Sequence, residues 1–484
     1  MKLDMIIEVN WLEVIFLVIP GIVVLLLLEN DIKEIKNISI WGSFTLLLMG
    51  ILLWIEFDPL AVDYQYQIMF FQDTLFTYHL GIDGISLFLV LLTLFLLPIC
   101  ILASWTSVTF YIKEFHILFF IVTFLLLNVF CVLDLLIFYM FYESILIPMF
   151  LIIGIWGSRT RKIHAAYQFF LYTLFGSVIM LLAIIYLYIT VGTLHISKLI
   201  LYDFTELENK VIWLAFFASF AVKVPMIPVH IWLPEAHVEA PTAGSVLLAG
   251  ILLKLGTYGL IRYSLPMFPF GTAYYAPLVY MLSIISIIYA SLTTLRQIDL
   301  KKVIAYSSVV HMNYVTMGIV SENQIGIEGA IFFMISHGLV SSGLFLCVGF
   351  LYERGHSRVA FYYGGLSQLM PIWSILFFGL SLANISLPGT SSFIGEFLIC
   401  MSLNEGSVIS ILLSMFGIFF GTSFSVLCFN KVLYGVGNMY ETFIDINRRE
   451  TVLIGSCLGL SIVLGIYPEL ILNYLHTSVI ALTL

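Results

Sequence analysis

Four ionisable side chains lie where the surrounding sequence is apolar enough to cross a membrane. They are Glu143, Lys223, Lys254 and Glu396. A charged residue at the centre of a membrane helix costs about 2.5–3.5 kcal/mol on insertion scales, so such residues persist where they are paired or where they line water. Carboxylates and amines in that position can exchange protons, which is the chemistry they indicate. The alternative, polar residues that only fix helix packing, stays open for each of them.

Two of these residues lie beside predicted breaks in the helices. A proline-rich stretch follows Lys223, and Pro388 and Gly389 precede Glu396. Proline removes a backbone donor and clashes with the preceding turn, so an unbroken helix is not expected at either place. Irregular backbone at membrane depth is tolerated when it is buried in protein or lines water, and transporters use broken helices to build ion sites. We therefore expect a polar pathway at both breaks.

Histidines extend this set of titratable groups. His311 and His337 lie inside apolar segments next to serines, and His230 and His237 follow the break after Lys223. A lone histidine in a helix is more often a packing residue. In series with Lys254 and Glu396, however, His311 and His337 predict a proton relay. Metal binding is not predicted, because neither has a second histidine or a carboxylate one turn away.

The composition shows which elements must hold these residues. Of the 484 residues, 61% are apolar and only 10% are charged, and the mean hydropathy is +1.08. A soluble domain has roughly 25% charged residues, so this chain lacks the side chains for a polar shell. The composition excludes a soluble enzyme and a disordered scaffold, and the net charge of −9 excludes a nucleic-acid binder. We expect a polytopic membrane protein.

No cofactor or metal site is predicted in this chain. The six cysteines lie singly in apolar segments without a CxxC pair, which argues against a disulfide framework, a zinc site and an iron–sulfur cluster. Neither GxGxxG nor a P-loop pattern is present, so nucleotide binding is not predicted. The chain is expected to move protons or cations and not to carry out redox chemistry by itself.

Hydropathy predicts an all-α fold of about fourteen transmembrane helices. A membrane helix needs about 20 mostly apolar residues, and runs of this kind are centred near residues 20, 47, 93, 124, 145, 179, 220, 252, 285, 310, 338, 382, 418 and 464. The runs near 124 and 145 are nearly continuous, so the count could differ by one. No sustained alternation predicts a transmembrane strand. We expect residues 1–484 to form a single domain.

Positive charges predict how the helices are oriented. Most of the 20 Lys and Arg residues fall in every second connection, for example Lys33, Arg159 and Lys301. Under the positive-inside rule these connections face the cytoplasm or the matrix, and both termini face the opposite side. One missed or invented helix would scramble this alternation, so an even number of helices is favoured.

Several segments resemble one known family, subunit 4 of respiratory complex I, the proton-pumping NADH:ubiquinone oxidoreductase, which is called subunit M in bacteria. The similar segments are residues 78–88, 141–150, 221–259, 295–313, 335–349 and 387–398. The second reads FYESILIPMF, the fifth ISHGLVSSGLFLCVG and the last LPGTSSFIGEFL. The resemblance runs in order from about Gly81 to Phe397, and it is thinner over the first 80 and the last 50 residues. It is closer to mitochondrial forms of plants and protists than to animal or bacterial forms.

The resemblance implies a specific fold and specific roles. It implies two inverted five-helix repeats, at about residues 112–262 and 272–435, with helices seven and twelve broken. The family's helix-five glutamate and its lysines on helices seven and eight correspond to Glu143, Lys223 and Lys254. Its helix-twelve glutamate corresponds to Glu396, and His337 matches a histidine thought to link two half-channels. Tyr142 departs from the plant pattern, where proline is expected, which puts the local helix geometry in doubt.

The resemblance also implies an activity and its setting. The chain would be a core membrane-arm subunit that translocates protons, coupled to electron transfer from NADH to ubiquinone. NADH, FMN, iron–sulfur clusters and ubiquinone would be handled by other subunits. The expected partners are the neighbouring antiporter-like subunits 2 and 5, accessory subunits and lipids, in the mitochondrial inner membrane or a bacterial plasma membrane. Both termini would lie on the intermembrane-space side. The alternative functions are a subunit of a multisubunit bacterial cation/proton antiporter and a purely structural subunit.

Overall fold

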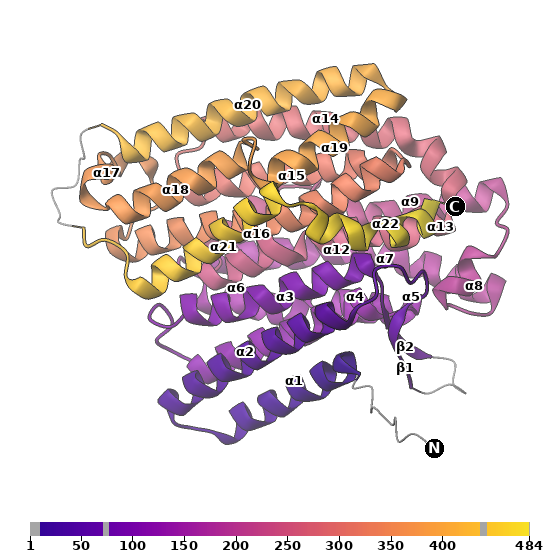
Figure 1. Cartoon of the computed structure of the whole chain (residues 1–484), viewed down its shortest axis with the longest axis horizontal. Coiled ribbons are helices and arrows are strands. Elements are labelled where there is room, and N and C mark those ends of the chain that lie inside the picture. Colours follow the sequence, from indigo (N-terminus) through magenta and orange to yellow (C-terminus); the bar gives the residue numbers. More distant parts are fainter. Residues whose placement is uncertain (1–9, 71–76, 436–442, 484) are drawn as a thin grey trace.

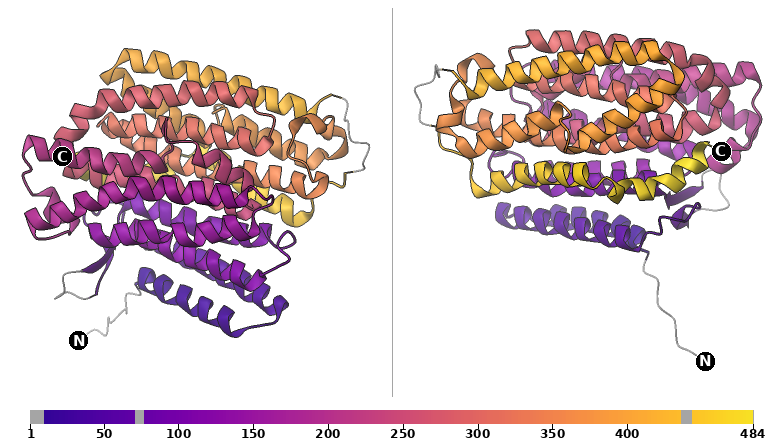
Figure 2. Two further views of the ribbon diagram at one scale, coloured as in Figure 1. Left: turned by 180° about the vertical axis from the view of Figure 1, so that it is seen from behind. Right: turned by 45° about the horizontal axis from the view of Figure 1, so that its top comes forward.

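The computed structural model describes residues 10–70, 77–435 and 443–483, and most of them are helical. The helices lie roughly parallel to one another in one bundle, with α1 at its outer edge (Figures 1 and 2). In the described part of the chain, twelve helices are long and apolar enough to cross a membrane. This arrangement confirms the all-α, polytopic prediction.

The twelve long helices are α1 (Trp11–Leu28), α2 (Ile32–Glu56), α3 (Gly84–Ala103), α4 (Ile112–Cys131), α5 with α6 (Leu135–Ser144 and Leu146–Trp156), α7 (Lys162–Val191), α11 to α13 (Thr242–Met267), α14 (Pro269–Arg296), α15 (Leu300–Val320), α16 (Gln324–Gly355), α20 (Val408–Leu433) and α21 (Arg448–Ile466). Each coincides with a predicted apolar run.

The two other predicted runs form interrupted helices. Helix α9 (Glu206–Lys223) ends at Lys223, and α10 (Trp232–Glu239) follows after a turn. Helix α18 (Pro371–Asn384) is separated in the same way from α19 (Ser391–Gly406). The breaks lie where proline and glycine predict them. A count of fourteen crossings requires each interrupted pair to cross once, and it stays a prediction, as does the division into inverted repeats.

Shorter elements complete the described chain: the strands β1 (Gln65–Phe70) and β2 (Tyr78–Ile82), and the helices α8 (Ile196–Ile200), η3 (Ala360–Tyr362), α17 (Leu366–Leu369) and α22 (Glu469–Thr483). The strands pair antiparallel, with Gln65 opposite Ile82. Helix α22 was not predicted as a separate element. Pro468 ends the preceding helix, because the residue before a proline is pushed out of the helical region.

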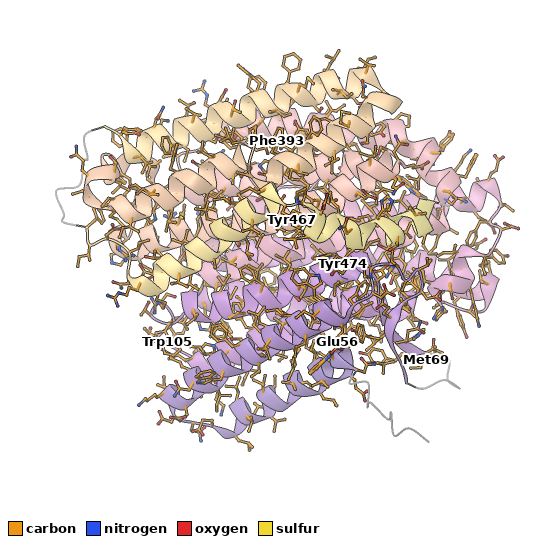
Figure 3. All side chains as sticks on the ribbon, viewed as in Figure 1. Glu56, Met69, Trp105, Phe393, Tyr467 and Tyr474 are labelled. Atoms are coloured by element: carbon orange, nitrogen blue, oxygen red, sulfur yellow. The ribbon has the colours of Figure 1, made fainter. Side chains whose placement is uncertain are left out.

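The described part of the chain begins and ends at the same end of the bundle. The Trp11 indole donates a hydrogen bond to Glu56 at the end of α2 (2.7 Å), and the Thr477 hydroxyl donates to the carbonyl oxygen of Pro59 (2.8 Å). Glu56 and Tyr474 lie toward this end, whereas Trp105 lies toward the other (Figure 3). The first nine residues lie outside the described part of the chain.

A buried ion pair joins α3 to the helix that follows the first break. Asp83 caps the N-terminus of α3 and accepts a hydrogen bond from Arg262 (2.8 Å). Both side chains are buried, and the hydroxyl groups of Tyr64 and Tyr258 also accept hydrogen bonds from the guanidinium. Removing one partner of such a pair is more damaging than removing both, because a lone charge stays buried.

We expect Asp83→Asn to destabilise the protein by about 3–5 kcal/mol, because asparagine keeps the helix cap while Arg262 loses its counter-charge. Asp83→Asn combined with Arg262→Gln should be less damaging than Asp83→Asn alone. The midpoint of thermal unfolding of the purified assembly, followed by scanning fluorimetry, measures both. Equal losses in the single and the double variant would show that the pair is not the cause.

Candidate functional site

Lys254 lies at the centre of Thr242–Met267, one of the most deeply buried long helices of the described chain. Its side chain is completely buried. The segment Leu248–Leu252 directly before it is a π-helical turn, η1, which is a distortion frequently found at functional sites. The Lys254 amine donates to the carbonyl oxygen of Ala249 (2.6 Å) and lies 2.9 Å from Nδ1 of His337.

A glycine allows the helices of this lysine and this histidine to approach closely. Gly338 follows His337 on α16, and Gly250 lies one turn before Lys254. A Cβ atom on Gly338 would lie 3.0 Å from the carbonyl oxygen of Gly250, whereas one on Gly250 would lie 2.4 Å from a side-chain carbon of Leu96 on α3. A side chain at position 338 would therefore press on the segment that carries Lys254, and one at position 250 would press on α3.

His311 continues the row on the other side of His337. The two imidazole rings have centroids 5.7 Å apart. Nδ1 of His311 lies 3.5 Å from a carboxylate oxygen of Glu396, and Nε2 lies 3.2 Å from the amide oxygen of Asn384. Asn384 is the last residue of α18, and Glu396 lies in the second turn of α19. Residues on both sides of the second break thus contact the His311 ring.

This arrangement places four groups that can bind a proton in one row. Lys254, His337, His311 and Glu396 come from four different helices, and each of them can hold or release a proton. No hydrogen bond among the described residues joins His337 to His311, so proton transfer between these two rings requires ring rotation or a bridging water. The amine can donate to Nδ1 of a neutral His337, and a neutral amine can accept from it. The structure brings together four of the seven predicted site residues in this row.

Glu396 is also reached from outside the row. It lines a cavity of about 410 Å³ between α19 and α20, together with Phe393, Phe397 and Cys400. Phe393 is labelled on this part of the bundle in Figure 3. Phe397 is half exposed, so the cavity opens on an outer face of the bundle. Glu396 therefore borders a mostly apolar cavity as well as the row.

Lys223 and Glu143 form a second, separate group. The amine of Lys223 donates to the carbonyl oxygen of Tyr142 (2.9 Å) and lies 3.3 Å from the centre of the Tyr142 ring. A desolvated contact between a cation and an aromatic ring is worth about 2 kcal/mol. Tyr142 is thus a direct partner of the lysine.

Glu143 is the neighbour in sequence of Tyr142, which Lys223 contacts. No ion pair within 4.0 Å joins Glu143 and Lys223 in the described part of the chain. At an effective dielectric constant of 20, opposite charges separated by more than 4 Å interact by less than about 4 kcal/mol. Glu143 lies just before a kink at Ile145, where Pro148 provides no donor for the carbonyl of Ser144.

The remaining histidines lie outside the row. His230 is buried in the break after α9, with its ring near those of Tyr289 and Tyr306. His237 is fully buried and stacks on Phe345 at 4.7 Å. No hydrogen bond or ring contact among the described residues joins either of them to His311 or His337. The role predicted for His230 stays a prediction.

Two residues of interest were missed by sequence reasoning. Asn384 lies in an apolar run, and nothing in the sequence of that run predicts its contact with His311. Lys301 belongs by sequence to a cationic connection, but it is buried and donates to the carbonyl oxygen of Ala240 (2.9 Å). That carbonyl is free because α10 has ended and Pro241 follows. Pro241, next to a predicted break, indicated that a backbone carbonyl group would lack a helical partner. It did not indicate which side chain would donate to that carbonyl group.

Comparison with known families agrees with this architecture. Residues 132–421 match the family model described as the transmembrane region of NADH:quinone oxidoreductase and Mrp antiporters. NADH-ubiquinone oxidoreductase chain 4 of Marchantia polymorpha is 54% identical over 475 residues, covering 97% of this chain and 96% of that protein. The chain belongs to this family. Chain 4 of Arabidopsis thaliana is 53% identical, covering 95% of this chain and 94% of its own length.

Two solved structures contain chains with the same fold as the present chain, which is a member of the chain-4 family. A chain of respiratory complex I from Thermus thermophilus with bound NADH superimposes with a TM-score of 0.90 at 26% identity, covering 98% of this chain and 99% of that chain. A chain of the archaeal membrane-bound sulfane sulfur reductase superimposes with a TM-score of 0.87 at 23% identity, covering 96% of this chain and 77% of that chain. The second likeness concerns the fold alone.

Proposed function

We propose that this chain translocates protons as a membrane-arm subunit of NADH:ubiquinone oxidoreductase, and that the row from Lys254 through His337 and His311 to Glu396 is the path. Membership of the chain-4 family supports the setting. The observation that carries the path is the series of contacts at 2.9 Å between Lys254 and His337 and at 3.5 Å between His311 and Glu396.

The proposed sequence of events begins at Lys223. The Tyr142 carbonyl and ring, together with the more distant charge of Glu143, stabilise its ammonium form. When quinone reduction elsewhere in the complex changes the neighbouring charge, Lys223 releases its proton toward Lys254. No hydrogen bond joins the two lysines in the described structure, so this step needs water. His337 and His311 then pass the proton on, with ring rotation or one water between them, and Glu396 releases it.

The wider setting belongs to the same proposal. As a subunit, the chain contributes to an NADH:ubiquinone oxidoreductase, while NADH, FMN, iron–sulfur clusters and ubiquinone bind to other subunits. Antiporter-like subunits 2 and 5 are its proposed neighbours. The membrane is the mitochondrial inner membrane, as the plant relatives support, and both termini face the intermembrane space. The shared position of the described ends and the distribution of cations support this orientation.

A second function is a subunit of a multisubunit cation/proton antiporter. The matching family model supports this alternative, because its description also names Mrp antiporters. A free-standing antiporter would contain the same lysine and glutamate row but would not accompany NADH oxidation. The two functions therefore differ in the assembly that contains the chain.

A native gel of membranes solubilised in mild detergent separates these functions. The gel is stained for NADH dehydrogenase activity and probed for this chain with an antibody. We expect the chain to migrate with a very large, active band. Migration in a smaller, inactive band would overturn the assignment to the redox-coupled complex.

Asn384→Ala tests the position of His311 in the row. We expect proton translocation by the assembled complex to fall about fivefold, the factor equivalent to one hydrogen bond of about 1 kcal/mol. Asn430→Ala, at an exposed position of α20, is the matched control. Proton uptake measured with a pH-sensitive dye in sealed vesicles provides the comparison. An unchanged rate in Asn384→Ala would remove Asn384 from the mechanism.

A further inference from the structure

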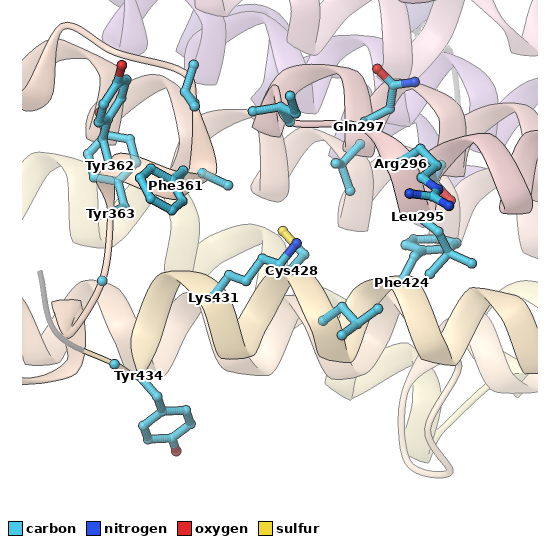
Figure 4. A pocket seen from close by; sticks show the side chains of 18 residues that line it. Leu295, Arg296, Gln297, Phe361, Tyr362, Tyr363, Phe424, Cys428, Lys431 and Tyr434 are labelled. Carbon is cyan, nitrogen blue, oxygen red and sulfur yellow. The ribbon is translucent and has the colours of Figure 1, made fainter. Parts of the chain in front are cut away.

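A cavity of about 830 Å³ (Figure 4) lies near α17 and the end of α20, at the end of the bundle opposite to the described chain ends (Figure 1). Its walls are the last turn of α14, the segment around η3 and the final turns of α20. The segment around η3 is held to α20 by hydrogen bonds from the Gly365 amide to the Tyr434 carbonyl and from the Ser367 hydroxyl to the Leu433 carbonyl. Hydrogen bonds thus fix the walls of this cavity, and neither Lys254 nor Glu396 is among its lining residues.

Two cations line this cavity without an ion-pair partner among the described residues. Arg296 ends α14, and Lys431 lies near the end of α20. Neither forms an ion pair within 4.0 Å in the described structure, and no aspartate or glutamate among the described residues lines the cavity. In Figure 4 the Lys431 side chain extends toward Cys428, and Arg296 lies across the cavity. Two uncompensated cations around one cavity favour an anionic occupant.

The rest of the lining is apolar and aromatic. Leu295, Phe424 and Leu427 form one side, and Phe361 and Tyr362 form another. Leu427, Phe361 and Tyr362 are exposed. Aromatic side chains of this kind are enriched where a membrane protein crosses from lipid to water. A small soluble anion would gain nothing from these walls, whereas an amphiphile would.

The outer face next to the cavity is apolar as well. Helices α14 and α20 pack side by side, as the views of Figure 2 show. Tyr289 and Leu292 on α14 and Phe419 on α20 are 45–65% exposed. Both helices are apolar enough to cross a membrane, so this face is suited to acyl chains.

We propose that an anionic phospholipid binds here, with its phosphate between Arg296 and Lys431 and its acyl chains along the outer face of α14 and α20. Basic pockets between transmembrane helices on the cytoplasmic or matrix side are suited to anionic headgroups. The cationic connections of this chain gather on the side predicted to face the matrix. This site is separate from the proton row, so the inference does not depend on the proposed path.

The test uses the intact, delipidated complex and measures lipids retained on it by native mass spectrometry. Phosphatidylglycerol is the anionic probe and phosphatidylcholine is the zwitterionic control. We expect Arg296→Gln with Lys431→Gln to weaken phosphatidylglycerol binding about 30-fold, since each Lys or Arg near an anionic surface contributes about 1 kcal/mol. Phosphatidylcholine binding should change little.

Two matched variants separate this site from general effects of charge. Lys33→Gln with Arg161→Gln removes two exposed cations elsewhere in the cationic connections and should leave binding unchanged. Arg296→Lys with Lys431→Arg keeps both charges and should retain binding. Equal binding by the Arg296/Lys431 and Lys33/Arg161 glutamine variants would overturn the proposal.

Two further results would also overturn it. Inorganic phosphate that displaces phosphatidylglycerol at equal concentration would show that the acyl chains add nothing and that the site binds a free anion. A photo-crosslinker placed at Leu427 that captures another subunit of the complex, and not lipid, would show that protein occupies the cavity. Crosslinking to lipid is the result that we expect.

Discussion

Glu143→Gln is expected to lower proton translocation by at least about tenfold, because glutamine keeps the size of the side chain but removes both its charge and its ability to hold a proton. Glu143 has no direct ion-pair partner within 4.0 Å in the described structure, and one of its carboxylate oxygens is buried without a hydrogen bond. Neutralising it therefore leaves no salt-bridge partner stranded. We expect the substitution to lower the number of protons moved per NADH oxidised and to leave the stability of the protein unchanged.

The measurement is the number of protons moved per NADH oxidised in sealed vesicles. Glu114→Gln is the matched control, because Glu114 is an exposed glutamate in the first turn of α4. Assembly of both variants is verified by native gel. If Glu143→Gln moved protons at the full ratio, the charge of Glu143 would have no part in the mechanism.

Lys254→Met should abolish translocation through this chain while leaving the complex assembled. The amine is fully buried and makes both of its contacts to Ala249 and His337. Methionine fills a similar volume without a polar group, so the row loses its first member and no charge is left unpaired. Replacing a buried polar group by an apolar one of similar size is often neutral for stability, or stabilising.

The same variant separates a functional role from a purely structural one. A structural lysine would leave translocation intact when replaced, and stability would stay the same or rise. Lys198→Met, at an exposed position of α8, controls for the loss of a positive charge. Translocation and the thermal unfolding midpoint are measured on the same preparations. Full translocation in Lys254→Met would contradict the proposed row.

Much of the fold was accessible from sequence because it depends on local properties. The length of an apolar run decides whether a helix can cross a membrane, and every long helix of the described chain coincides with a predicted run. Proline and glycine predicted the breaks after Lys223 and before Glu396, since a missing donor acts on the turn that contains it. Helix α22 was not separated from its neighbour, because hydropathy is continuous across Pro468.

The site was only partly accessible. Charges deep in apolar runs pointed to Glu143, Lys223, Lys254 and Glu396, because burying a charge is costly wherever the run lies. Charge alone did not show that Lys223 contacts Tyr142, or that Lys301 is buried. Those outcomes depend on which carbonyl groups the broken helices leave free and on which side chains lie opposite them.

The sequence by itself determined that this chain crosses a membrane many times, that two of its helices are interrupted, and that titratable groups lie at membrane depth. These properties follow from the spacing of apolar, proline and charged residues within single segments. Only the tertiary structure decided which groups touch. Lys254 and His337 are 83 residues apart in the chain. They meet where Gly338 lets its helix approach the carbonyl oxygen of Gly250 closely, which is a property of helix packing that no single segment contains.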